Sequence, residues 1–229
     1  MDKMKRISSF VEKNELLVKD ESVTDTLSDL ANYSCLLAGY IESKRREFSK
    51  NQILDLSLIC ADGLQLPFYP GCFSCSFCHF LLLWIDDPLK LLLEMRRVTR
   101  PGSVILAMAE PDYGGRIDHP AELVHLGQQQ AKSLYQQGAD PLIGRKLRNL
   151  FHQAGLENIQ TGILGGHWGG LPSQVSWDSE WNTIEQDMAD LVSAEELSEQ
   201  RQLDAAAWQN GERILYVPTF YTWGFVPGG

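Results

Sequence analysis

The amino-acid sequence predicts an α/β fold, with a sheet covered by helices on both faces. From Leu56 onward, apolar strand-like runs alternate with helix-like segments, and this alternation is typical of α/β domains. The runs at residues 73–84 and 103–109 are apolar almost throughout, as expected for strands buried on both sides. The 229 residues are 44% hydrophobic, enough for a packed core, and we expect one domain over residues 1–229.

Each expected element follows from local pattern. The predicted strands are Leu56–Cys60, Phe73 to Trp84 (ending in a turn), Ser103–Ala109, Asn158–Leu164 and Arg213–Val226. The predicted helices begin at Pro88, Pro120 and Asp140, and two more cover residues 181–191 and 194–208. Asp87 and Ser193 stand where N-caps belong, and Pro101-Gly102 is expected to stop the first helix. Pro218 favours an edge position, a bulge or a kink in the last strand.

Charge is concentrated in one stretch. The formal net charge is −10, and residues 174–212 hold ten acids but only one base, Arg201. This pattern is typical of solvated helical faces, and we expect an acidic helical insertion over residues 171–212. The sequence offers no basic face for a nucleic acid. No apolar run is long enough to span a membrane, and no apolar segment follows the basic start, so we expect a cytoplasmic protein.

Cysteines are the next candidates for chemistry. In the cytoplasm, the five cysteines are expected to be reduced thiols. Cys72, Cys75, Cys78 and His79 have a spacing that could suit a metal. In a strand, however, alternation would put Cys75 on the opposite face from Cys72 and Cys78. We therefore expect buried apolar thiols and no metal site.

The segment from Cys60 to Gly102 carries a family resemblance. It holds Asp62 at a strand end, Leu66-Pro67-Phe68, an apolar strand, Glu94-Met95-Arg96-Arg97-Val98 and Arg100-Pro101-Gly102. This combination resembles the middle of a class I S-adenosylmethionine-dependent methyltransferase, of the small-molecule type related to ubiquinone/menaquinone-biosynthesis enzymes. The resemblance implies a Rossmann-like sheet, mostly parallel with an antiparallel last strand. It also implies that the insertion before the last strand helps to close a pocket for a small-molecule substrate.

The resemblance also suggests cofactor residues and exposes a departure. Asp62, Gly63 and Leu64 match the adenine-reading turn, His79 lies on the cofactor side, and Glu42 stands one residue after the place of the ribose-binding acid. The family's glycine-rich loop would fall at residues 16–24, yet no glycine precedes Gly39. Asp20, Ser22 and Thr24 occupy the glycine positions, so residues 1–52 are predicted to be a degenerate or truncated N-terminal part.

Polar residues after later strands are candidates for the substrate side. Ligands of open α/β sheets bind at the carboxyl ends of strands. His79, Glu110 and His167 are candidate bases, and Tyr113, Arg116 and Trp168 are candidate substrate contacts. For each of these, an ordinary core or turn role remains the alternative.

Three functions stay open from the sequence. The first is an S-adenosylmethionine-dependent methyltransferase acting on a small molecule, with S-adenosylmethionine as its cofactor. The second is a catalytically inactive, methyltransferase-like binding or scaffold protein, or an incomplete gene product, motivated by the glycine-free start. A nicotinamide dehydrogenase is a more distant third, because the missing loop would harm it equally. The sequence does not identify the methyl acceptor or the oligomeric state.

Overall fold

A computed structural model describes residues 59–164, 174–188 and 191–228 of the chain. Four sequence-based predictions lie outside these residues: most of the strand at 56–60, the loop at 16–24, Glu42, and the turn that holds His167 and Trp168. In the part that is described, no helix is long and apolar enough to cross a membrane.

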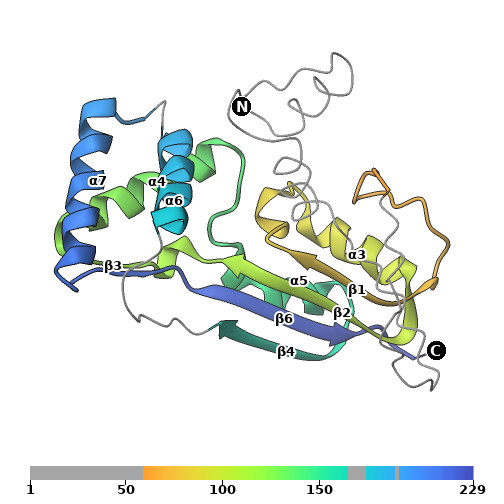
Figure 1. The fold of residues 1–229 in the computed structure, drawn as a ribbon. Coiled ribbons are helices and arrows are strands. Elements are labelled where there is room, and N and C mark those ends of the chain that lie inside the picture. The colour runs from red at the N-terminus through yellow and green to blue at the C-terminus, as the bar shows by residue number, and fades with distance from the viewer. Residues whose placement is uncertain (1–58, 165–173, 189–190, 229) are drawn as a thin grey trace, which may run out of the picture.

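The main sheet has four described strands in the order β1-β2-β6-β4 (Figure 1). Strand β1 (Phe73–His79) pairs in parallel with β2 (Thr99–Pro111). Strand β6 (Thr219–Phe225) pairs antiparallel with β2 and with β4 (Glu157–Leu164). The last strand thus runs against the other three and lies between two of them. The predicted Rossmann-like sheet, mostly parallel with an antiparallel last strand, is confirmed.

Two helices form a layer on this sheet. Helix α3 (Pro88–Val98) contacts β1 and β2, and α5 (Leu147–Gln153) contacts β4 and β6; the two helices also contact each other. Their apolar side chains meet the inward residues of the strands in one core, which includes Leu91, Leu92, Met95, Ile105, Ala107 and Phe151, all without exposed surface. As predicted, the Asp87 side chain caps α3 by accepting the Lys90 N–H at 2.9 Å.

A second core lies beyond one end of the sheet. Helices α4 (Val124–Gln136), α6 (Gln174–Met188) and α7 (Ala194–Gln209) enclose it, and the short strands β3 (Ile117–His119) and β5 (Ile214–Tyr216) pair antiparallel beside it. Figure 1 shows these elements gathered at the left end of the sheet. We call this group the cap. Its apolar core includes Leu126, Trp181, Ile184 and Met188.

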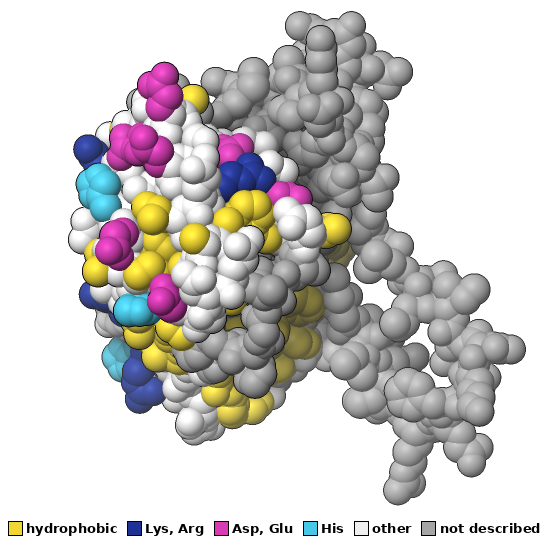
Figure 2. All heavy atoms as spheres, turned by 60° about the vertical axis from the view of Figure 1, so that its left-hand side comes forward, with side chains coloured by type: hydrophobic (Ala, Val, Ile, Leu, Met, Phe, Trp, Pro, Cys, Tyr) yellow, Lys and Arg dark blue, Asp and Glu magenta, His cyan; other side chains and the backbone are white. Residues whose placement is uncertain are grey.

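The acidic residues of the cap lie among other surface types. Figure 2 turns this side of the molecule forward, and Asp and Glu side chains are spread between polar and apolar ones rather than gathered in one patch. Glu195 and Glu199 of α7 are exposed, and Ser193 caps that helix by accepting the Glu196 N–H at 3.1 Å. Glu195 and Glu199 agree with the expected solvated helical faces, whereas Asp204 of the same acidic stretch is buried.

The prediction of one long final strand over residues 213–226 was wrong in its extent. Pro218 separates β5 from β6, and the two strands join different sheets. Proline has no N–H for a ladder, but its carbonyl accepts the Asp112 N–H at 2.8 Å. Of the alternatives that Pro218 favoured, the edge position does not apply to β6, which lies inside the sheet, and the run is instead divided into two strands at this residue.

Helix boundaries also differ from the predicted ones. Helix α3 ends at Val98 and β2 begins at Thr99, so Pro101-Gly102 lies within the strand and does not stop the helix. The segments predicted as helices from Pro120 and from Asp140 begin with short 3-10 turns at Ala121–Leu123 and Ile143–Lys146. The α-helical parts start only at Val124 and Leu147.

Candidate functional site

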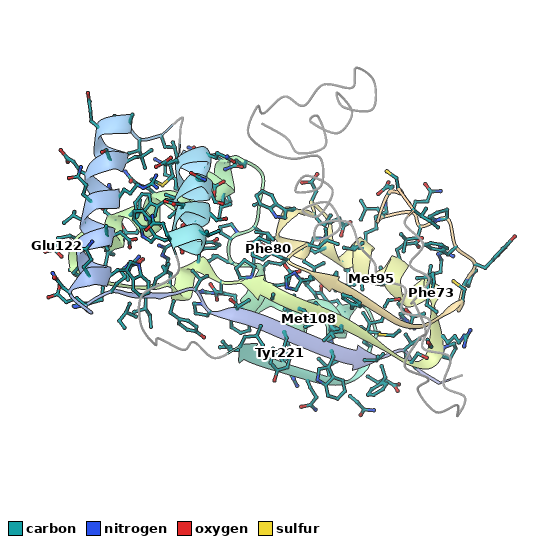
Figure 3. All side chains as sticks on the ribbon, viewed as in Figure 1. Phe73, Phe80, Met95, Met108, Glu122 and Tyr221 are labelled. Atoms are coloured by element: carbon teal, nitrogen blue, oxygen red, sulfur yellow. The ribbon has the colours of Figure 1, made fainter. Side chains whose placement is uncertain are left out.

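The carboxyl ends of β1 and β2 form the candidate site. His79 pairs in register with Met108, and the Phe80 N–H donates to the Met108 carbonyl at 3.0 Å, so the strands leave the sheet side by side. Phe80 and Ala109 both have left-handed backbone, with φ of 51° and 56°. Non-glycine residues adopt this region at a cost and gather at functional sites. Figure 3 labels Phe80 and Met108.

Glu110 is the buried acid of this edge. Its side chain has no exposed surface, and its two oxygens accept the backbone N–H groups of residues 81–83 at 2.9, 3.0 and 3.3 Å. Those three residues form the turn that follows β1. Burial raises the pKa of Glu110 to about 7, although the three N–H groups partly oppose that shift. The predicted candidate base thus has its lone pairs directed at backbone donors.

His79 differs from Glu110 in access. It is the last residue of β1 and is exposed, whereas its neighbour Cys78 is fully buried on the opposite face of the strand. Strand alternation explains this, because successive side chains point to opposite faces. Among the three candidate bases, Glu110 is buried and His167 lies outside the described residues, whereas the His79 side chain is exposed at the end of its strand.

The predicted adenine-reading turn lies before β1. Asp62 is exposed, and its Oδ1 accepts the Leu64 N–H at 2.9 Å, while the Gln65 N–H donates to the Asp62 carbonyl. A Cβ on Gly63 would lie 3.1 Å from Leu91 Cδ1, so the turn packs closely on α3. The second carboxylate oxygen of Asp62 can accept a bond from an external amine.

The Glu94–Arg97 ion pair on α3 binds the backbone of the segment that follows this turn. Glu94 Oε1 accepts the Leu66 N–H at 2.7 Å, and Arg97 donates to Glu94 and to the carbonyls of Leu66 and Phe68. The nearby Arg97 guanidinium lowers the pKa of Glu94. The Leu-Pro-Phe and Glu-x-x-Arg motifs of the sequence are therefore two halves of one structural contact.

A bidentate ion pair follows the end of β2. Arg145 Nε and Nη2 donate to Asp112 at 2.6 and 2.7 Å, and Asp112 also accepts the Gly114 N–H. The Asp112 side chain is 5% exposed but that of Arg145 is 49% exposed. The predicted substrate contact Tyr113 lies between them in sequence and packs partly against the main core. Arg145 was missed from the sequence, since nothing in its local pattern distinguishes it from a surface arginine.

Arg116 belongs to a group of buried ion pairs in the cap rather than to the ends of β1 and β2. Its guanidinium donates to both Asp118 oxygens and to Gln130, and its side chain is only 6% exposed. A substrate would have to compete with these partners. Its predicted substrate role, like those of Tyr113, His167 and Trp168, stays a prediction.

The described residues form no metal cluster and have an open groove away from the candidate site. Within 59–164, 174–188 and 191–228, no group of three or more His, Cys, Asp or Glu side chains could hold a metal ion. An open groove of about 470 Å³, lined in part by Pro70, Arg96 and Pro101, lies at the amino end of β2. That groove is at the opposite end of the strand from Glu110.

Comparison with known proteins indicates one family. Residues 34–107 match the family model described as a methyltransferase domain. An uncharacterized methyltransferase of Schizosaccharomyces pombe is 32% identical over 107 residues, which are 46% of this chain and 38% of that protein. The chain thus spans less than half of the length of this curated relative.

The chain is also similar to methyltransferases of known structure. A methyltransferase of Bacillus halodurans has 14% identity and a TM-score of 0.44, over 76% of this chain and 79% of that one. Phosphoethanolamine N-methyltransferase 2 of Haemonchus contortus, solved with S-adenosylhomocysteine, has 16% identity and a TM-score of 0.40, over 73% and 36% of the two chains.

Proposed function

We propose that this chain, which matches the methyltransferase domain family over residues 34–107, transfers a methyl group from S-adenosylmethionine to a small molecule. The observation that carries the proposal is that match, because it spans both the Asp62 turn and the end of β1. The topology supports the proposal too, since ligands of open α/β sheets bind outside the carboxyl ends of strands.

The residues of this edge fit the cofactor in part. Asp62 Oδ2 can accept a bond from an exocyclic amine while Oδ1 keeps the Leu64 N–H, and His79 stands exposed at the next strand end. Bound there, S-adenosylmethionine would supply an electrophilic methyl carbon. The task of the protein is then to orient the acceptor, exclude water and, where the acceptor needs it, remove a proton. We assign that last role to His79, because the Glu110 oxygens are held by backbone N–H groups.

Calorimetric titration with S-adenosylmethionine and S-adenosylhomocysteine tests the proposal. We expect micromolar binding, and Asp62→Ala should weaken it about 10- to 100-fold, the usual effect of losing a hydrogen bond to a charged group. Asp86→Ala, which removes another exposed acid, is the matched control and should bind like the wild type. The absence of both heat and thermal stabilisation at millimolar cofactor would contradict the proposal.

A second candidate is a methyltransferase-like protein that no longer turns over. The observation that favours it is the replacement of the expected loop glycines by Asp20, Ser22 and Thr24. Glycine lets the backbone approach a ligand closely, and acids there would repel the cofactor carboxylate. If the wild type fails to bind but a variant with glycine at these three positions does bind, this second function is the correct one.

A further inference from the structure

We propose that Glu110 is a positioning residue, whose carboxylate holds the turn at residues 81–83 and thereby sets the backbone of His79 and Phe80 at the end of β1. This inference rests on the proposed function for the identity of the ligand, but not for the contact itself. It assigns Glu110 to the site without making it a catalytic base.

The first step of the argument is how Glu110 comes to face this turn. Strand β2 changes register against β6 between Ala107 and Glu110, and Ala109, at φ 56°, stands within that irregularity. A bulge of this kind re-aims the side chain that follows it. The carboxylate consequently reaches the neighbouring strand's turn, where Phe80 at φ 51° starts the departure from β1.

The second step is what the carboxylate does there. Residues 82–84 form a short 3-10 turn whose preceding residue, Leu81, has no side-chain cap. Glu110 takes the place of a cap by accepting the N–H groups of residues 81–83. The far end of the turn is tied by the Asp140 N–H, which donates to the Leu83 carbonyl at 2.7 Å. With both ends held, small shifts of this turn are transmitted to His79.

The third step concerns the proton. Among the residues that the structure describes, the groups that act on Glu110 are those backbone N–H groups and the buried Cys78 thiol, whose own pKa is raised by burial and by Glu110. A proton on Oε2 would meet the Leu83 N–H, which has the longest of the three contacts, 3.3 Å. The turn therefore has three acceptor contacts when the acid is ionised and two when it is neutral. Because the pKa is about 7, this change falls near neutral pH.

One experiment measures S-adenosylhomocysteine affinity at pH 6 and pH 8. If only the ionised form holds the site, the competent fraction rises about tenfold over this range, and the dissociation constant should fall by the same factor. Glu110→Gln, which cannot ionise, should remove this dependence. Glu122→Gln is the control, because Glu122 is an exposed acid far along the cap in Figure 3, and it should keep the wild-type profile.

A second readout needs no ligand. Hydrogen exchange of the amides of residues 81–83, corrected for intrinsic rates, should show protection that rises from pH 6 to pH 8 in the wild type and stays low in Glu110→Gln. Equal protection in both proteins, or a pH-dependent affinity that persists in Glu110→Gln, overturns the role of Glu110. Absence of S-adenosylhomocysteine binding at either pH, with the exchange pattern as expected, counts against the methyltransferase proposal instead.

Discussion

The main sheet and the cap are stabilised by different kinds of interaction. Apolar packing fills the core between the sheet and helices α3 and α5, and the buried acid Glu110 is satisfied there by backbone N–H groups. The cap instead contains a chain of buried charges that runs from Arg116 through Asp118 and Arg213 to Asp204. These four side chains are only 2–7% exposed, so water contributes little to their solvation.

The two regions should therefore differ in how well they tolerate a substitution. Apolar contacts in the sheet tolerate exchange of one aliphatic side chain for another of similar volume. The cap network requires charge and hydrogen-bond geometry together, because Asp204 accepts Arg213 Nε, Trp177 Nε1 and Trp181 Nε1. One carboxylate thus ties α7 to α6 and to the segment that leads into β5. We therefore expect the largest single-residue effects in the cap.

Asp204→Ala should be the most destabilising change. It leaves a buried guanidinium without one carboxylate partner, and it leaves the indole N–H groups of the buried Trp181 and the half-buried Trp177 without this acceptor. Breaking a buried pair by removing one partner costs about 3–5 kcal/mol. Urea unfolding followed by tryptophan fluorescence measures the loss. Glu185→Gln is the control, since its pair with Arg201 is 30–40% exposed and should contribute only about 0–1 kcal/mol. A cost for Asp204→Ala as small as the control's would mean that the network is not what holds the cap.

Leu92→Ala tests the sheet side of the comparison. Leu92 is fully buried between α3 and the strands, and truncating such a leucine costs about 2–5 kcal/mol. Its neighbour Leu93 is 44% exposed, and Leu93→Ala should change stability by about 0.5 kcal/mol or less. Thermal unfolding of both variants measures the contrast. Similar losses for the two would indicate that the helix presents a different face to the sheet.

The sequence also predicted the main sheet better than the cap. Periodicity and capping residues predicted β1 and α3, because these depend on local pattern and on one apolar layer. The antiparallel direction of β6 was implied by the family resemblance. The cap network joins residues 116 and 118 to residues 204 and 213, and no local pattern links them. For the candidate site, the role of Asp62 was implied by the family resemblance and those of His79 and Glu110 by their places at strand ends, and these roles stay predictions. The buried state of Glu110 and the Arg145 contact depend on tertiary packing and could not be predicted.

The ionisation of Glu110 gives the sheet a pH dependence of its own. Its pKa rises from an ordinary value of 4.5 to about 7 on folding, so between these values the folded state binds more protons than the unfolded state. This contribution to stability is complete below pH 4.5, falls as pH rises towards 7 and is absent above it. A shift of this size corresponds to about 3 kcal/mol. The wild type should therefore lose about that much relative to Glu110→Gln between pH 4.5 and pH 7.5, measured by urea unfolding. Parallel curves for the two proteins would show that Glu110 ionises as it does in the unfolded chain.

The two helix caps should give the smallest effects and the most direct comparison. Asp87 accepts the Lys90 N–H at the start of α3, and Ser193 accepts the Glu196 N–H at the start of α7. Removing such a cap costs about 1 kcal/mol in most proteins, and both caps are exposed. Asp87→Ala and Ser193→Ala should therefore cost nearly the same, although one helix lies on the sheet and the other in the cap. Asp86→Ala, next to the first cap but not in it, is the control. A clearly larger loss for Ser193→Ala would mean that the start of α7 supports the buried charges of the cap, and that local and network stability are coupled there.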